Sequence, residues 1–109
     1  MIHVTYYRSY HRLTVSGHAN SGRKGKDLIC CAASTLAYTM GANVEQMYES
    51  GIVRNPVTVF KDKDGEAEIS CNPKPNMKNL VTMVFDSICV GFEMLAAKYP
   101  DFVSYEIRP

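Results

Sequence analysis

Residues 27–51, DLICCAASTLAYTMGANVEQMYESG, form the most strongly patterned segment of the chain and predict one long amphipathic helix. Apolar residues recur at steps of three and four along it: Ile29, Ala33, Leu36, Met40, Val44 and Met47. Asp27 is a favourable N-cap, and Gly51 is a favourable residue just past a helix C-terminus. Gly41 inside the helix costs ~1 kcal/mol relative to alanine unless close packing requires it.

Strand-like segments lie on both sides of this helix. Residues 2–8 and 11–18 are rich in β-branched and aromatic types, with two residues between them, and predict a hairpin. Residues 55–61 and 66–71 flank the sequence DKDG, residues 62–65. An Asp-Gly pair between two such segments is a strong hairpin signal, so a second hairpin is expected here.

A second helix and a last strand complete the pattern. Asn76 is the expected N-cap, and Pro100 ends the helix. Its predicted core-facing stripe comprises Leu80, Val81, Val84, Ile88, Phe92 and Leu95. Residues 102–108 alternate as a strand. The order β-β-α-β-β-α-β predicts an α+β fold in one domain, residues 1–109, with two helices on one antiparallel-rich mixed sheet in a two-layer sandwich.

Composition limits the kinds of partner. The 109 residues include 12 basic and 11 acidic side chains, for a net charge of +1. This balance gives no general attraction to nucleic acid or to an anionic membrane, so nucleic acid is expected as a partner only indirectly. No stretch is expected to reach the roughly 20 apolar residues that span a bilayer, and residues 1–11 lack a signal-peptide pattern. A cytoplasmic protein with no membrane partner is therefore expected.

The cysteines are expected to be thiols rather than disulfides, because two of the four are adjacent. No pair has CxxC spacing, so neither a metal site nor another cofactor is expected. Core positions are expected for Cys31, Cys71 and Cys89, and surface positions for His3 and His11.

Residues 17–34, GHANSGRKGKDLICCAAS, hold the side chains best suited to chemistry. His18 is expected to end a strand, and Cys30 falls in the first turn of the helix, where free N–H groups and the helix dipole stabilise a thiolate. The thiolate could attack a carbonyl, His18 could act as general acid/base, and N–H groups at the helix start could form an oxyanion hole. A cysteine in a helix is as often a buried core residue, so these local features leave the nucleophile and the core residue as equal alternatives for Cys30.

Supporting roles are expected close to this pair. Asp27 either caps the helix or orients His18, while Asn20 and Ser34 are weaker candidates for orienting the imidazole. The basic loop residues Arg23, Lys24 and Lys26 suggest an alternative, a non-enzymatic module that binds RNA or protein through residues 22–26. A third interpretation, a thiol redox protein, would use a Cys30–Cys31 disulfide or a sulfenate.

Taken together, Gly17-His18-Ala19, a glycine-containing loop and the segment from Asp27 to Ser34 resemble the signature of the ribosomal-processing cysteine protease family Prp. The resemblance covers essentially the whole chain. It implies that His18 and Cys30 are the catalytic pair of a cysteine protease. One departure is Cys31, which stands where the family commonly has alanine; alignment on Asp27 and Ser34 favours Cys30 as the nucleophile.

The resemblance also implies a substrate and an assembly. Prp-like enzymes remove a short N-terminal extension from a large-subunit ribosomal protein, number twenty-seven, and cut after an aromatic residue in a hydrophobic segment. A homodimer is implied, as is a substrate-gating loop, matched here by residues 19–26 with Gly22 and Gly25. We expect this loop to leave His18 and Cys30 too far apart to hydrogen-bond before substrate binds.

Overall fold

The computed structural model describes residues 1–19 and 27–109. Along the chain these residues form β1 (Ile2–Tyr7), η1 (Arg8–Tyr10), β2 (Arg12–Ser16), α1 (Leu28–Glu49), β3 (Val53–Lys61), β4 (Glu66–Pro73), α2 (Lys78–Lys98) and β5 (Val103–Arg108). The short 3₁₀ helix η1 lies inside the first hairpin. The order of strands and α-helices is the predicted β-β-α-β-β-α-β.

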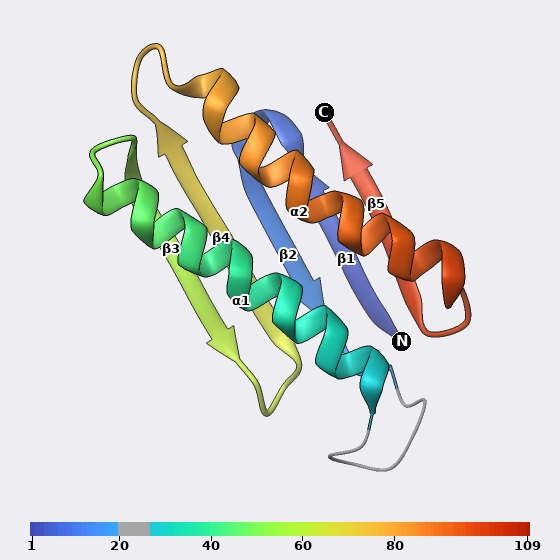
Figure 1. Ribbon diagram of the computed structural model, residues 1–109. Coiled ribbons are helices and arrows are strands. Elements are labelled where there is room, and N and C mark those ends of the chain that lie inside the picture. Colours follow the sequence, from blue (N-terminus) through green and yellow to red (C-terminus); the bar gives the residue numbers. More distant parts are fainter. Residues whose placement is uncertain (20–26) are drawn as a thin grey trace.

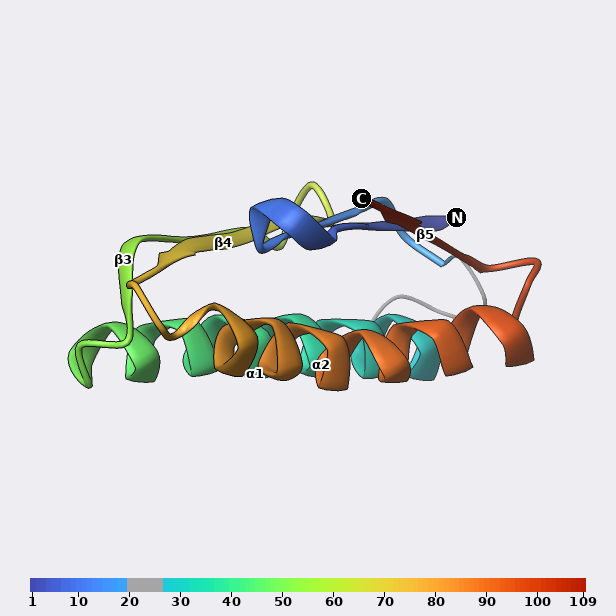
Figure 2. The same ribbon diagram turned by 90° about the horizontal axis from the view of Figure 1, so that it is seen from above.

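The strands form one mixed sheet of five strands in the order β3-β4-β2-β1-β5. The pairs β1–β2, β2–β4 and β3–β4 are antiparallel, whereas β1 and β5 are parallel. Both helices pack on the same side of the sheet (Figure 1), and the edge-on view in Figure 2 separates the helical layer from the sheet. The predicted two-layer α+β sandwich is therefore confirmed.

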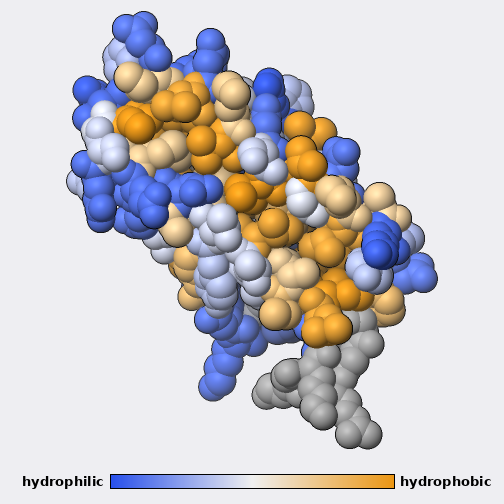
Figure 3. Space-filling view, viewed as in Figure 1, coloured by the Kyte–Doolittle hydropathy of each residue, from blue (hydrophilic) through white to orange (hydrophobic). Residues whose placement is uncertain are grey.

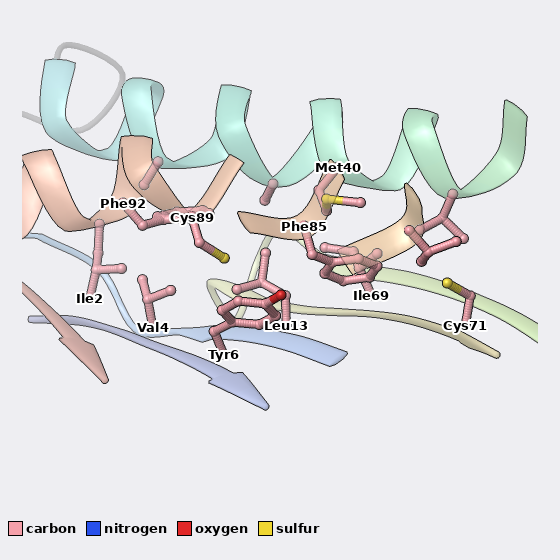
Figure 4. Close-up of a cluster of buried hydrophobic side chains, with 14 of the residues drawn as sticks. Ile2, Val4, Tyr6, Leu13, Met40, Ile69, Cys71, Phe85, Cys89 and Phe92 are labelled. Carbon is pink, nitrogen blue, oxygen red and sulfur yellow. The ribbon is translucent and has the colours of Figure 1, made fainter. Parts of the chain in front are cut away.

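The core lies between these two layers. Ile2, Val4 and Tyr6 project from alternate positions of β1 toward the helices, where Phe85 and Phe92 of α2 meet them (Figure 4). Each of these side chains is 2% exposed or less. The predicted core positions of two cysteines are confirmed: Cys71 and Cys89 are buried, and burial raises the pKa of their thiols to about 11 and about 12.

Helix α1 begins and ends as its sequence predicts. Asp27 is the N-cap, and Gly51 follows the C-cap residue Ser50 with a left-handed φ of 75°. Gly41 is used by close packing, because a Cβ atom there would lie 2.8 Å from Cζ of Phe60 on β3. The aromatic ring of Phe60 can therefore lie directly against the helix backbone.

Helix α2 departs from its prediction at two positions. Asn76 is not the N-cap: it adopts a left-handed φ of 69° in the turn closed by the bond from Met77 N–H to the Lys74 carbonyl, and Met77 takes the cap position without a side-chain bond. Leu80 was expected in the core stripe but is 46% exposed. The fully buried residues of α2 are instead Val81, Phe85, Cys89 and Phe92.

The side of α2 that faces away from the sheet is also apolar. Figure 3 shows hydrophobic residues running across the helical layer, with polar residues gathered at its margins. Among the described residues, α2 is the one helix long and apolar enough to cross a membrane by length and composition. The expectation that no segment reaches that composition was therefore too strict. In this fold one side of α2 packs on the sheet through its buried residues Val81, Phe85, Cys89 and Phe92.

The prediction of a surface position is confirmed for His3 but wrong for His11. His11 is 4% exposed, and its Nε2 lies 2.8 Å from the Thr82 hydroxyl of α2. The η1 turn and a left-handed φ of 49° direct the imidazole inward, edge-on to Phe85. Burial, aided by the positive charges of Lys78 and Arg8, lowers the pKa of His11.

Candidate active site

Cys30 lies in the first turn of α1, as predicted. The Asp27 carboxylate accepts hydrogen bonds from the N–H groups of Ile29 at 3.0 Å and Cys30 at 3.1 Å. This confirms the capping role of Asp27. The N–H groups of Ile29 and Cys30 are therefore engaged by Asp27, and the expectation of an oxyanion hole at the helix start rests on the other N–H groups there.

The Cys30 sulfur meets the chain segment that follows β2. The backbone N–H of Ala19 donates a hydrogen bond to Cys30 Sγ at 3.2 Å, and the cysteine is half-buried. A donated N–H group and the positive end of the α1 dipole both stabilise negative charge on the sulfur. This microenvironment differs from that of Cys71 and Cys89, whose burial opposes ionisation.

His18 was expected to end a strand. It lies instead two residues beyond the end of β2, which is at Ser16. Its side chain is exposed and lines the same cavity as Cys30. The predicted pair is thus brought together in space by the end of β2 and the start of α1. The predicted gating loop is outside the described residues, except for Ala19.

The cavity has a volume of about 230 Å³ and a mixed lining. Its apolar lining comes from the β-strands and from the small residues of α1, while His18 and the carboxylates of Asp62 and Glu66 add polar groups. The full set of lining residues is Ile2, Val15, Gly17, His18, Cys30, Ala33, Ser34, Ala37, Tyr38, Phe60, Asp62, Gly65, Glu66 and Ala67.

The weaker candidates divide between the cavity and the part of the chain outside the described residues. Ser34 lies one turn after Cys30 on α1 and lines the cavity. Asn20, Gly22, Gly25 and the basic residues Arg23, Lys24 and Lys26 fall outside the described residues, so their expected roles remain predictions.

Sequence analysis missed the wall formed by Tyr38, Phe60 and the β3–β4 turn. Tyr38 lies eight residues after Cys30, about 80° away around the helix, so helical spacing alone did not single it out. Its ring centroid is 4.8 Å from that of Phe60, and its hydroxyl donates to Asp62 at 2.5 Å. Nothing local in the sequence indicates that the β3–β4 turn reaches His18.

Cys31 was expected in the core but is exposed. Adjacent residues of a helix point about 100° apart, so the residue after the cavity-facing Cys30 is turned toward solvent. Chemically, the site combines a half-buried thiol at a helix start, an imidazole and an apolar cavity. That combination suits nucleophilic attack on a carbonyl followed by proton transfer to the leaving group.

Comparisons with known proteins agree with this arrangement. Residues 1–104 match the family described as cysteine protease Prp. The ribosomal processing cysteine protease Prp of Mycoplasma pneumoniae is 31% identical over 98 residues, covering 90% of this chain and 88% of that protein.

Solved structures share the fold. The ribosomal processing protease Prp from S. aureus, in complex with a covalently linked product peptide, superposes with a TM-score of 0.73 at 17% identity, covering 98% of this chain and 97% of that chain. SMU.848 from Streptococcus mutans gives a TM-score of 0.67 at 23% identity, covering 97% and 90%. The family match and the M. pneumoniae relative extend this agreement to sequence. The chain therefore belongs to the Prp family and is a cysteine protease.

Proposed function

We propose that this enzyme is an endopeptidase in which Cys30 is the nucleophile and His18 is the general acid/base. One observation carries the proposal: both side chains line one cavity, at a point where the Ala19 N–H group already donates to the Cys30 sulfur. Neither Cys71 nor Cys89 has access to a comparable setting, because both are buried in the core.

The reaction follows from these groups. His18 takes the thiol proton, and the Cys30 sulfur forms a bond to the substrate carbonyl carbon. The C–N bond then breaks, His18 returns the proton to the departing amine, and an acyl thioester remains on Cys30. Water, deprotonated by His18, attacks the thioester and releases the carboxylic acid and the thiol. Asp27 fixes the helix start that holds the sulfur.

The proposed substrate is the N-terminal extension of large-subunit ribosomal protein twenty-seven, processed in the cytoplasm. The name of the M. pneumoniae relative supports a ribosomal substrate. The apolar lining, with Phe60 and Tyr38 as one wall, suits the aromatic residue after which such enzymes cut. Asp27 and Ser34 have positioning roles at most in this scheme.

The two thiols of the Cys30–Cys31 pair provide a matched test. The chain is incubated with the extended ribosomal protein, and the product is identified by mass spectrometry. Cys30→Ala and His18→Ala are each expected to abolish cleavage, whereas Cys31→Ala retains it. Full activity in Cys30→Ala would refute the assignment of the nucleophile, and loss of activity in Cys31→Ala would reassign it.

We further propose that the enzyme is a homodimer that pairs through the exposed side of α2. This side carries residues spaced alternately by three and four positions, the pattern of a helix–helix seam: Leu80, Met83, Ser87, Val90, Met94 and Ala97. Antiparallel two-fold pairing places Leu80 opposite Ala97 and Val90 opposite Ser87, so a larger side chain faces a smaller one in these two pairs. The third pair places Met83 opposite Met94.

Charge is compatible with this pairing. Of the two carboxylates of α2, Asp86 is turned away to the Arg8 guanidinium, with bonds of 3.1 and 3.0 Å, and Glu93 is exposed beside the six seam positions but is not one of them.

Sedimentation equilibrium tests the dimer with two valine-to-glutamate variants. Val90 in the seam is 55% exposed, and Val59 on β3 is 43% exposed. Val90→Glu is expected to give a monomer, whereas Val59→Glu stays dimeric like the wild type. A monomeric wild type or a dimeric Val90→Glu protein would refute this interface.

A further inference from the structure

The turn between β3 and β4, residues 62–65, lies beside the proposed catalytic pair. Its last residue, Gly65, lines the cavity together with His18 and Cys30. Gly65 has a left-handed φ of 65°, and its N–H group donates to the Asp62 carbonyl at 3.3 Å. The turn geometry alone therefore favours glycine, although asparagine also adopts this conformation.

A second constraint at Gly65 comes from the His18 ring. A Cβ atom on residue 65 would lie 2.9 Å from both Cε1 and Nε2 of His18, and 2.5 Å from the carbonyl oxygen of Gly17. The imidazole therefore lies directly against bare backbone. Any side chain at position 65 would force the ring or the preceding peptide to move, and the turn geometry does not account for this requirement.

The turn is also joined to the helix that carries the nucleophile. The Tyr38 hydroxyl of α1 donates to the Asp62 carboxylate at 2.5 Å, and the Tyr38 ring packs on Phe60 at the end of β3. The wall behind His18 is thus held in place by the same helix that positions Cys30. The backbone that the imidazole lies against is therefore tied to the helix that carries the sulfur.

We propose that Gly65 is a positioning residue for His18 and that the β3–β4 turn is the surface that holds the imidazole in its working orientation. This proposal rests on the role of His18 as general acid/base proposed above. Proton transfer in a transition state depends steeply on donor placement, so displacement of the ring should lower kcat more than it affects substrate binding.

Gly51 supplies a matched control. It has a similar left-handed φ of 75°, but among residues 1–19 and 27–109 a Cβ atom there would meet only Lys74 Nζ, at 3.7 Å. Gly65→Asn and Gly51→Asn therefore add the same side chain at the same kind of backbone position, with and without the imidazole contact. For each variant we would measure kcat, KM and the pH dependence of Cys30 alkylation by iodoacetamide in a Cys31→Ala background.

Gly65→Asn is expected to lower kcat by ~10-fold or more and to shift the alkylation profile toward that of His18→Ala. Gly51→Asn should stay within ~2-fold of the parent in every quantity. Equal kcat values and profiles in the two asparagine variants would overturn the proposal. If Gly65→Asn does not fold, Tyr38→Phe decides: a lowered kcat at unchanged melting temperature supports the proposal, and an unchanged kcat overturns it.

His18→Ala separates this inference from the function on which it rests. An active His18→Ala enzyme would refute the catalytic assignment and the role of Gly65 with it. An inactive His18→Ala enzyme combined with a fully active Gly65→Asn enzyme would refute only the role of Gly65.

Discussion

Two histidines flank the same short strand, and they occupy opposite environments. His11 precedes β2, is 4% exposed, and is paired with the Thr82 hydroxyl of α2. His18 follows β2, is exposed, and lines the cavity that contains Cys30. The imidazole is the same in both places, so its neighbours decide its use: a buried, bonded ring contributes to stability, whereas an exposed ring beside a thiol can exchange protons.

The largest expected difference between the two histidines is in activity. His18→Gln should lower kcat/KM by ~100-fold to 10,000-fold, the usual contribution of a general acid/base, and leave the free energy of unfolding within ~0.5 kcal/mol of wild type. His11→Gln, assayed alongside by peptide cleavage, should keep activity within ~3-fold. If His11→Gln were less active than His18→Gln, the assignment of different uses to the two histidines would be wrong.

The next effect concerns stability. His11→Ala removes a buried ring that packs edge-on against Phe85 and pairs with Thr82, so it should lower the free energy of unfolding by about 1–3 kcal/mol in urea titration. His3→Ala is the control, because His3 is exposed and should change stability by less than ~0.5 kcal/mol. Equal stabilities for the two variants would show that the burial of His11 contributes nothing.

A smaller effect isolates the polar partner. Thr82→Val keeps the shape of the side chain but leaves the buried imidazole of His11 without its hydroxyl, at a cost of ~1–2 kcal/mol in unfolding free energy. The cost should largely vanish when His11 is already alanine, which a double-mutant cycle would measure. Additive effects would show that the two side chains do not interact.

The smallest expected effect is a pH dependence of stability. Burial lowers the pKa of His11 below its ordinary value of ~6.5, so the unfolded chain binds a proton at a higher pH than the folded chain does. The contribution of His11 is therefore full above pH ~6.5 and declines as pH falls toward its folded pKa, by less than ~1.4 kcal/mol per pH unit.

The measurement is the difference in unfolding free energy between wild type and His11→Gln, which cancels other titrating groups. The positive charges of Lys78 and Arg8 add to the lowering of the His11 pKa by burial, whereas the negative charge of Asp86 raises that pKa. A difference that grows as the pH falls, rather than shrinking, would contradict the lowered pKa.

Sequence reasoning succeeded where the deciding interactions are local. The Asp27 cap, the Gly51 stop and the Asp-Gly turn depend on residues within a few positions, and each is present as predicted. The α2 stripe shifted because Leu80 and Phe85 are both apolar, and only the position of the sheet decides which of them is buried.

The errors at the two histidines share one physical cause, which is contact across the sheet or between layers. The burial of His11 depends on Thr82, 71 positions away, and the setting of His18 depends on Gly65 in another hairpin. The presence of His18 and Cys30 in one cavity was foreseen from their motif, whereas Tyr38, Phe60 and Gly65 came from the fold.

The parallel pairing of β1 with β5 has a consequence for folding during synthesis of the chain. Ile2, which lines the cavity that contains His18 and Cys30, is opposite Val103 in this pairing. The edge of β1 stays open until residues 103–108 have been synthesised and released from the ribosomal tunnel. A contact spanning nearly the whole chain also raises the contact order and slows folding. The protease thus reaches its finished sheet only after translation has passed its last strand.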